Sequence, residues 1–341
     1  MALNPKLEFF RFTLKPKDKN FKTFKEFAIT KFELDKSSSD AEIMKKYFSY
    51  FIESLDGDYS KDENQKKQIT LIKNEEVNKY LQYQPKFKSD ANVIHGVING
   101  GSYGRERILT NKNDTNECTE MSLDDSVLQY YYFLLYLPLD HNEGGFILHS
   151  NSGSESITKI FRRFISKVFG HDGFYKTEAE LFSPISFQDE FKKGSHLQNM
   201  SFKKSFVDNI PNTNGISNKL DEYDIIVKVV PKNKGISISQ INQVRNLFSK
   251  FILSRGNQTD IIGDFDETKF EVRNPINKSN KTFEWNKKDN EFSPVVYLEG
   301  RIDNFNLDGT PDFKELEELC QNLFNDEVLP ELRPDLNVTR A

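Results

Sequence analysis

The segment between residues 128 and 170 restricts the fold of this chain more than any other. Residues 128–140 (LQYYYFLLYLPLD) and 145–151 (GFILHSN) are two apolar runs separated by HNEG. Apolar runs on either side of a short turn that contains glycine predict a β-hairpin. In the following stretch, ESITKIFRRFISKVF, apolar residues recur every three or four positions, which predicts an amphipathic helix ending at Gly170. The sequence therefore predicts a hairpin covered by a helix.

The same combination of strands and an amphipathic helix recurs along the chain. Strands are predicted over residues 7–14, 68–74, 92–100 and 223–231, and in a meander over 269–274, 281–286 and 294–303. The segment GGSYGRERILTN is predicted to pair with 92–100 as a hairpin partner. Amphipathic helices are predicted over 40–55, over 236–253 and from Thr310 onward, and short helices around 186–206.

Hairpins outnumber helical crossovers in this pattern, which favours the α+β class. We expect antiparallel or mixed sheets built from hairpins, each followed by an amphipathic helix packed on one face. Strong periodicity lapses over residues 171–220. The predicted organisation is therefore an N-terminal domain or half over 1–170, an irregular connecting region over 171–220, and a C-terminal domain or half over 221–341.

Charge and cysteine content limit the environment of the protein. The 47 basic and 52 acidic residues give a net charge of −5, but the excess of acid is concentrated at the C-terminal end. Residues 1–36 hold nine basic and five acidic residues, and residues 311–341 hold three and eight. The two cysteines, Cys118 and Cys320, lack partners at metal-ligand spacing, and no apolar run could insert into a membrane. These features predict a cytoplasmic protein without a cofactor.

The strongest candidate for ligand binding is the glycine-rich stretch that follows residue 95. Successive backbone N–H groups in such a stretch can form an anion nest, and arginines can bind phosphate through two hydrogen bonds. A tyrosine ring can stack on a base, and His95 is a candidate for proton transfer, with His149 as a partner that only the fold could bring close. The alternative is a solvent-exposed hairpin without a ligand. The candidate ligand-binding residues of this stretch are Gly100, Gly101, Ser102, Tyr103, Gly104, Arg105 and Arg107.

A second candidate lies at the start of the helix after residue 155. The small-residue loop SNSGS precedes that helix, and a helix N-terminus with Ser154 can bind an anion. Arg162 and Arg163 lie two turns into the helix and would suit a longer ligand such as a nucleic-acid backbone. The alternative is that Ser154 only caps the helix.

A metal-dependent nuclease would need carboxylates that converge on one site. The acidic stretch GDFDETKFE supplies Asp264, Asp266 and Glu271, although it lacks the spacing of a calcium-binding loop. A solvated acidic surface explains the same residues.

Three functions follow from these observations. The first is nucleic-acid binding, RNA rather than DNA, through the N-terminal part, in a bacterial protein that would suit an antiviral or abortive-infection system. The second is a protein-interaction or homo-oligomeric assembly module that uses an aromatic surface and the acidic C-terminal helix. The third is a metal-dependent nuclease. No family resemblance guides the choice among them.

Overall fold

The computed structural model separates into two compact units. Unit 1 comprises residues 1–182 and 296–341, and unit 2 comprises residues 183–295. The residues described are 5–15, 23–110, 113, 118–150, 156–170, 179–182, 184–185, 196–209, 220–232, 240–248, 251–255, 258–262, 265, 267–273, 280–285, 292–294, 296–298, 300–306 and 309–337. Unit 2 is thus inserted into the sequence of unit 1.

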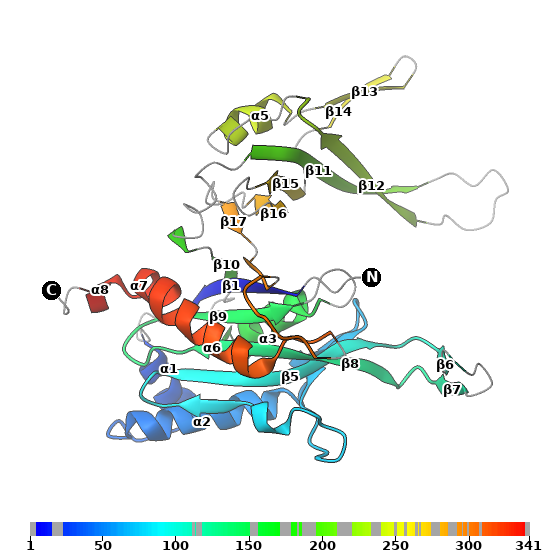
Figure 1. Cartoon of the computed structure of the whole chain (residues 1–341). Coiled ribbons are helices and arrows are strands. Elements are labelled where there is room, and N and C mark those ends of the chain that lie inside the picture. Colours follow the sequence, from blue (N-terminus) through cyan, green and yellow to red (C-terminus); the bar gives the residue numbers. More distant parts are fainter. Residues whose placement is uncertain are drawn as a thin grey trace. The chain divides into compact units, whose positions relative to one another are not determined.

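A large antiparallel sheet forms the centre of unit 1 (Figure 1). In the described part of the chain it has nine strands, with the main order β10-β1-β9-β8-β5-β3-β2, while β18 pairs with β1 and β4 with β5. Its long central strands explain the apolar runs of the sequence, because both faces of the sheet are covered. The strands are β1 (Lys6–Thr13), β2 (Lys61–Asp62), β3 (Lys67–Thr70), β4 (Lys86–Lys88), β5 (Val93–Tyr103), β8 (Ser126–Tyr136), β9 (Glu143–Ser150), β10 (Glu180–Leu181) and β18 (Val296–Tyr297).

Three helices cover one face of this sheet: α1 (Phe24–Lys31), α2 (Asp40–Ser54) and α3 (Thr158–Gly170). Their apolar sides form one buried cluster with alternate residues of β1, β5, β8 and β9. Aromatic rings fill much of it, and Phe51 of α2 contacts Phe133 of β8 and Phe164 of α3. Ser39 starts α2 through a capping box with Glu42. The many phenylalanines therefore serve this core.

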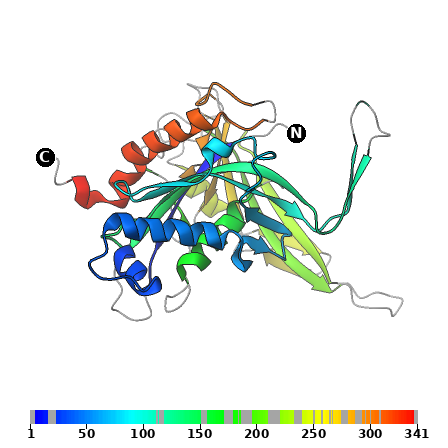
Figure 2. The same ribbon diagram turned by 90° about the horizontal axis from the view of Figure 1, so that it is seen from below.

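The C-terminal segment covers the opposite face. It consists of α6 (Phe313–Leu323), a π-helical segment (Phe324–Val328), α7 (Leu329–Leu332) and α8 (Pro334–Asn337). Figure 2 shows α2 in blue and α6 in red on opposite sides of the sheet. The ring of Tyr136 on β8 lies 5.1 Å from that of Phe324, and Leu332 approaches Gly145 of β9. Helices α1 to α3 thus cover one face of the sheet, and α6 provides a layer on the other.

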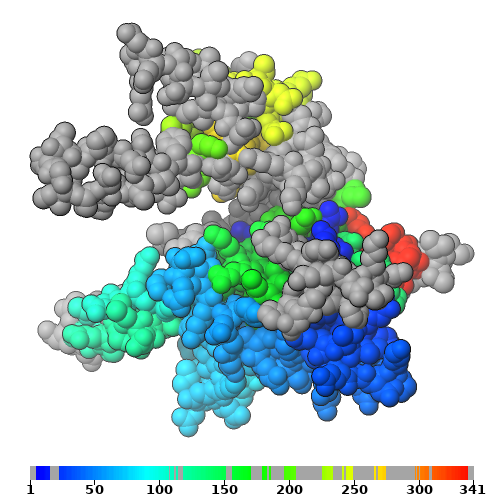
Figure 3. All heavy atoms as spheres, turned by 180° about the vertical axis from the view of Figure 1, so that it is seen from behind, coloured from blue at the N-terminus to red at the C-terminus, as the bar shows by residue number. Residues whose placement is uncertain are grey.

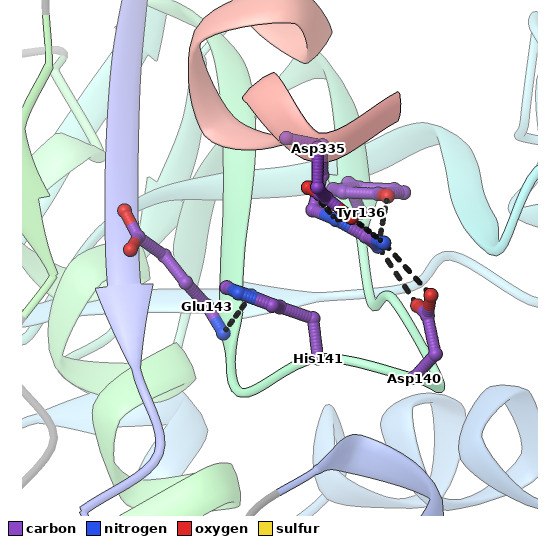
Figure 4. Close-up of polar contacts among 6 residues, drawn as sticks. Tyr136, Asp140, His141, Glu143 and Asp335 are labelled. Carbon is purple, nitrogen blue, oxygen red and sulfur yellow. Dashed lines mark hydrogen bonds and ion pairs between the residues drawn. The ribbon is translucent and has the colours of Figure 1, made fainter. Parts of the chain in front are cut away.

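A buried guanidinium holds the end of this segment against the β8–β9 hairpin. Arg333 donates to the carboxylates of Asp140 and Asp335, and its Nη1 lies 3.5 Å from the hydroxyl of Tyr136. Figure 4 shows these groups together, with His141 of the same turn accepting the backbone N–H of Glu143. The hairpin turn therefore positions the C-terminal helices.

The two strands that flank unit 2 in the sequence, β10 and β18, both pair with β1. Phe10 pairs with Leu181 of β10, and Leu7 pairs with Val296 of β18. The observed units therefore differ from the boundaries expected at 170 and 220: residues 296–341 belong to the same compact unit as the N-terminal part.

Unit 2 has its own antiparallel sheet, with the order β12-β11-β15-β16-β17. One face of this sheet and α5 (Ile241–Leu247) share a small core that includes Met200, Phe202 and Phe270. A separate hairpin pairs β13 (Phe251–Arg255) with β14 (Gln258–Ile262). The sheet strands are β11 (His196–Asn209), β12 (Leu220–Val229), β15 (Glu267–Arg273), β16 (Asn280–Trp285) and β17 (Phe292–Pro294).

The α+β class with antiparallel sheets is confirmed, and several local predictions are wrong. Residues 196–206 belong to a strand and not to a helix. The helix expected over 236–253 ends at Leu247, and β13 begins at Phe251. The last helix is capped by Asp312 and not by Thr310. No helix in the described residues is long and apolar enough to cross a bilayer.

Candidate nucleic-acid interface

The first two glycines of the predicted binding stretch lie inside β5 and are required by packing. Gly100 pairs with Ile69 of β3 and Gly101 with Leu128 of β8. A Cβ atom on Gly101 would lie 1.7 Å from the carbonyl oxygen of Val127, and one on Gly100 would lie 2.8 Å from the side chain of Ile157. These glycines let a neighbouring strand and the residue before α3 approach. The stretch 100–103 continues β5 and does not turn back to pair with 92–100 as expected.

The anion nest predicted for this stretch does not form. The backbone N–H of Tyr103 donates to the carbonyl oxygen of Lys66 at 3.0 Å, and that of Gly104 donates to the carbonyl oxygen of Leu123 at 3.1 Å. An anion would have to displace these bonds. Gly104 has a φ of 72°, which favours glycine, and it ends the long strand.

Tyr103 and Gly104 instead line a pocket of about 470 Å³ at the surface of unit 1. The pocket lies at the N-terminal ends of β3 and β8 and at the C-terminal end of β5, and its wall is mostly polar. Gln68 donates to the hydroxyl of Ser126 at 2.6 Å, so an amide and a hydroxyl lie side by side there. The lining residues are Lys61, Glu63, Lys66, Gln68, Tyr103, Gly104, Leu123, Asp124 and Ser126.

Tyr103 forms a firm part of the pocket wall. The ammonium group of Lys66 lies 5.6 Å from the ring centroid, and Lys66 also forms an ion pair with Glu63 at 2.9 Å. Burial, together with the nearby Glu63 carboxylate, raises the pKa of Tyr103 to about 12. The phenol therefore stays protonated at neutral pH and can act only as a neutral group. One face of the ring that was expected to stack on a base is already covered by a cation.

The arginines that follow lie at the start of a two-stranded ribbon. Ser102 is half-buried in β5, Arg105 is exposed after the strand, and Arg107 begins β6 (Arg107–Thr110). β6 pairs with β7 (Cys118–Met121). Arg105 is therefore placed at the mouth of the ribbon, next in sequence to the pocket residue Gly104.

The two neighbouring arginines of α3 have different surroundings. Arg162 donates through Nε and Nη2 to the carbonyl oxygen of Ala179, at 3.1 and 2.7 Å, and lies over the ring of Phe10. It serves the fold. Arg163 points outward and pairs with Asp62 at 3.1 Å, with 43% of its side chain exposed. Only Arg163 is available to a ligand as well as to its partner.

The Glu8 carboxylate lies beside the start of α3, where an anion site is predicted. Ser154 lies outside the described residues. Among the residues next to it, Thr158 donates to the buried carboxylate of Glu8, and Ser150 lies 3.0 Å from Ser156, measured between the hydroxyl oxygens. A carboxylate at a helix N-terminus is stabilised by the helix dipole. Glu8 therefore provides the negative charge that an external phosphate would bring.

A row of cations on α3 was not singled out from the sequence. Lys159, Arg163 and Lys167 are exposed at intervals of four residues, and α3 contains no acidic residue. Side chains four residues apart lie on one face of a helix, about 6 Å apart along its axis. We call these three residues the α3 stripe. Their spacing in the sequence was the signal that could have identified them.

The α3 stripe and the pocket both adjoin the edge strand β2. Arg163 contacts Asp62 in β2, and the preceding residue, Lys61, lines the pocket. In Figure 3, atoms of α3 in green lie next to the blue segment that contains β2. Because consecutive residues of a strand face opposite sides of a sheet, Asp62 points toward α3 and Lys61 points away from it, so a ligand that contacts both the α3 stripe and the pocket passes around β2 at the edge of the sheet.

His95 is not part of this region. It lies in β5 with 1% exposure, and its Nδ1 is 3.2 Å from the hydroxyl of Tyr132 and 3.6 Å from a carboxylate oxygen of Glu317 on α6. Burial lowers the pKa of His95 to about 4, although Glu317 acts in the opposite direction. A neutral, buried imidazole in this position cannot exchange protons with a ligand at the surface.

The features expected for a protein-interaction module are an exposed aromatic surface and a free acidic helix. Among the described residues with large exposed hydrophobic side chains, Phe305 is the single aromatic one. On α6, Glu315 accepts the backbone N–H groups of Asp303 and Asn304, and Glu317 pairs with Lys86. The acidic helix therefore uses two carboxylates within unit 1.

The metal site has no support in the part of the chain that is described. Asp264 and Asp266 lie outside the described residues, and Glu271 in β15 accepts a hydrogen bond from the amide of Asn199. No group of three or more metal-binding side chains occurs among the described residues.

Comparisons of the chain with protein-family models, curated proteins and solved structures gave no match.

Proposed function

We propose that unit 1 binds single-stranded RNA through the α3 stripe and the pocket beside Tyr103. The observation that carries the proposal is the exposed row of Lys159, Arg163 and Lys167 on a helix without an acidic residue. Phosphate contacts by lysine and arginine supply most of the affinity of nucleic-acid binding that does not depend on sequence.

The α3 stripe favours an extended polyanion over a single phosphate. Lys159 and Lys167 are two turns apart, so the stripe extends about 12 Å along the helix. A single phosphate can contact one end of such a row, whereas a nucleic-acid backbone can contact all of it. Asp62 neutralises part of the charge at Arg163. The α3 stripe should therefore bind any single anion weakly and should bind a longer ligand through several weak contacts.

The pocket favours a single strand over a duplex. Proteins recognise single-stranded RNA by taking unstacked bases into polar pockets and by contacting the 2′-hydroxyl. The volume of about 470 Å³ lies within the range of roughly 300–1,000 Å³ for small-molecule sites. Gln68 and Ser126 supply hydrogen-bonding groups for a base edge or for a 2′-hydroxyl.

The test is the affinity of the full chain for a fluorescent single-stranded RNA, measured by anisotropy over a range of salt concentrations. We expect Lys159→Gln/Lys167→Gln to weaken binding at low salt. If both lysines contact phosphates, the slope of log K against log salt falls by about 1.4, because each single-strand contact contributes roughly 0.7.

A matched control is available on α2. Lys45 and Lys46 are also exposed on a helix of unit 1, so Lys45→Gln/Lys46→Gln removes the same charge from another place. This variant should bind like the wild type. Equal losses in both variants would mean that net charge alone attracts RNA, and absence of salt-sensitive binding by the wild type would refute the proposal. Tighter binding to DNA of the same sequence would refute the preference for RNA.

We further propose that this activity belongs to the cytoplasm of a bacterium, in an antiviral or abortive-infection system. Its support is the suitability of RNA as a target in such systems. The measurement is phage plaque formation on cells that express the wild type or Lys159→Gln/Lys167→Gln. Equal plaque counts with and without the wild-type protein would count against the defence role.

A further inference from the structure

The charged side chains that line the pocket beside Tyr103 are an ion pair and two residues outside that pair. Lys66 and Glu63 form the ion pair at 2.9 Å, and the ammonium group of Lys66 also lies over the Tyr103 ring. Lys61 and Asp124 line the same pocket, and both are exposed. Among the residues that the structure describes, the carboxylate of Asp124 has no hydrogen-bond or ion-pair partner. The pocket therefore offers a ligand one unpaired carboxylate together with a second cation.

This balance of charges favours a neutral group in the pocket over a phosphate. Two carboxylates and two ammonium groups line it, so the lining has no net charge. A phosphate inside the pocket would lie beside the carboxylates of Glu63 and Asp124, and bringing like charges together is unfavourable. The phosphates of a bound strand therefore stay outside the pocket, and the group that enters it is a base.

An unpaired carboxylate distinguishes the four bases by the hydrogen-bond donors that each presents. A carboxylate accepts hydrogen bonds and does not donate them, and its two oxygens can accept two parallel bonds at once. Guanine presents two adjacent donors, N1–H and N2–H, on its Watson–Crick edge, whereas in the other three bases a donor on this edge neighbours an acceptor. Guanine also presents the acceptors O6 and N7. Lys61 and Gln68, which line the pocket, can donate to such atoms.

We infer that the pocket beside Tyr103 selects guanine from the bases of a single-stranded RNA, and that Asp124 determines this choice. The carboxylate of Asp124 accepts the N1–H and N2–H groups of the base, and Lys61 or Gln68 donates to O6. The inference rests on the proposed function, because the α3 stripe supplies the phosphate contacts that hold the strand beside the pocket. It adds to that function the base that the protein prefers.

The experiment measures the affinity of the full chain for a short fluorescent oligouridine and for the same RNA with one central guanine, adenine or inosine. We expect guanine to tighten binding by roughly five-fold to 150-fold relative to uracil and adenine, which is the discrimination given by one bidentate pair. Inosine lacks only the N2 amino group of guanine and should lose most of this preference. Equal affinities for the four RNAs would overturn the inference and leave the α3 stripe unaffected. Absence of salt-sensitive binding by all four would refute the proposed function as well.

Asp124→Asn tests the residue that determines the choice. The side chain is exposed, so the variant should fold like the wild type, but an amide offers one acceptor and one donor where guanine needs two acceptors. We expect it to bind oligouridine no more weakly than the wild type and to lose the preference for guanine. The control, Asp125→Asn, removes the same charge from the next residue, which accepts the backbone N–H of Ser122 at 2.7 Å and is not among the pocket residues. A preference that survives Asp124→Asn, or that both variants lose, would overturn the role of Asp124.

Guanine also occurs in free nucleotides, and a competition with GMP distinguishes this source from RNA. GMP presents the same base with a single phosphate, so it lacks the several phosphate contacts that a strand makes along the α3 stripe. We expect the guanine-containing RNA to bind at least roughly tenfold more tightly than GMP, a difference of about 1.4 kcal/mol. If GMP binds as tightly as the RNA, the source of the guanine is a free nucleotide, and RNA is not the ligand.

Discussion

Arg333 binds both carboxylate oxygens of Asp140, through Nη1 to Oδ1 at 2.8 Å and Nη2 to Oδ2 at 2.7 Å. The guanidinium comes from the end of α7, and the carboxylate comes from the turn between β8 and β9. The side chain of Arg333 is 4% exposed, whereas that of Asp140 is 67% exposed. The contact therefore anchors the C-terminal layer at a boundary between core and solvent.

We predict that Arg333→Met lowers the free energy of unfolding of unit 1 by about 1–3 kcal/mol. This is less than the 3–5 kcal/mol for breaking a fully buried pair, because Asp140 and Asp335 can be solvated when the cation is lost. The measurement is urea denaturation at neutral pH. Lys73→Met is the control: it removes an ion pair with Asp56 in which both side chains are more than half exposed, and it should cost less than about 1 kcal/mol. Equal losses in the two variants would contradict the anchoring role.

The stability of unit 1 should decrease between pH 6.5 and pH 4. Burial lowers the pKa of His95 to about 4 and that of His149 to about 3, both from 6.5. In this window the two histidines are protonated in the unfolded chain but stay neutral in the folded chain. The free energy of unfolding therefore decreases as the pH falls, by up to about 1.4 kcal/mol per pH unit for each histidine. Above pH 6.5 this contribution is constant.

The measurement is the urea midpoint at pH 7.5 and at pH 5 for the wild type and for His149→Gln. The substitution removes one titrating group and should make the difference between the two midpoints smaller. Arg333 lowers the pKa of Asp140 and that of Asp335 from 3.8. A carboxylate whose pKa is lowered by folding loses its stabilising effect only when the pH approaches or falls below its pKa in the unfolded chain. These two carboxylates therefore do not contribute between pH 7.5 and pH 5. A wild-type stability that does not change between the two pH values would contradict the prediction.

The spacing of apolar residues identified the helices and strands in which that spacing is not interrupted. The helix predicted over residues 40–55 corresponds to α2, with Ile43, Met44, Tyr47 and Phe51 buried as its stripe indicated. The β8–β9 hairpin was found for the same reason. β11 was missed because its register shifts between Leu197 and Asn199. A bulge of this kind breaks the two-residue alternation by which a strand is recognised.

Long-range packing could not be read from the sequence. Nothing local to Val296 indicates that the chain returns there to β1, and nothing local to Gly101 indicates that the carbonyl of Val127 lies against it. For the candidate site, the sequence identified Tyr103 and Gly104 but assigned Arg162 and Arg163 the same role. Adjacent residues of a helix point about 100° apart, and one of these two arginines turned out to face Ala179.

We predict that Tyr103→Ala weakens RNA binding by roughly five-fold to 150-fold without changing the salt dependence. Loss of an aromatic contact to a base is worth about 1–3 kcal/mol, and this interaction releases no counterions. Anisotropy titrations like those used for the α3 stripe measure both quantities. Tyr103→Phe keeps the ring and loses only a neutral hydroxyl, so it should bind within a few-fold of the wild type. A reduced salt slope in Tyr103→Ala would mean that the pocket contacts phosphate and not a base.

Gly101→Ala should destabilise unit 1 by at least about 3 kcal/mol. A methyl group placed 1.7 Å from the oxygen of Val127 cannot be relieved by rotation of a side chain, because the obstacle is backbone. β5 and β8 would have to move apart within the long ladder of paired residues that joins them. Gly57→Ala is the matched control: its added Cβ would meet the oxygen of Ser54 at 3.4 Å, an ordinary contact, so its effect should stay within about 1 kcal/mol. Urea denaturation compares the two. If Gly101→Ala proved as stable as Gly57→Ala, packing would not require glycine at position 101, and the ligand-binding role suggested by the sequence would explain it instead. A large loss of stability would show that the close approach of β8 requires glycine there.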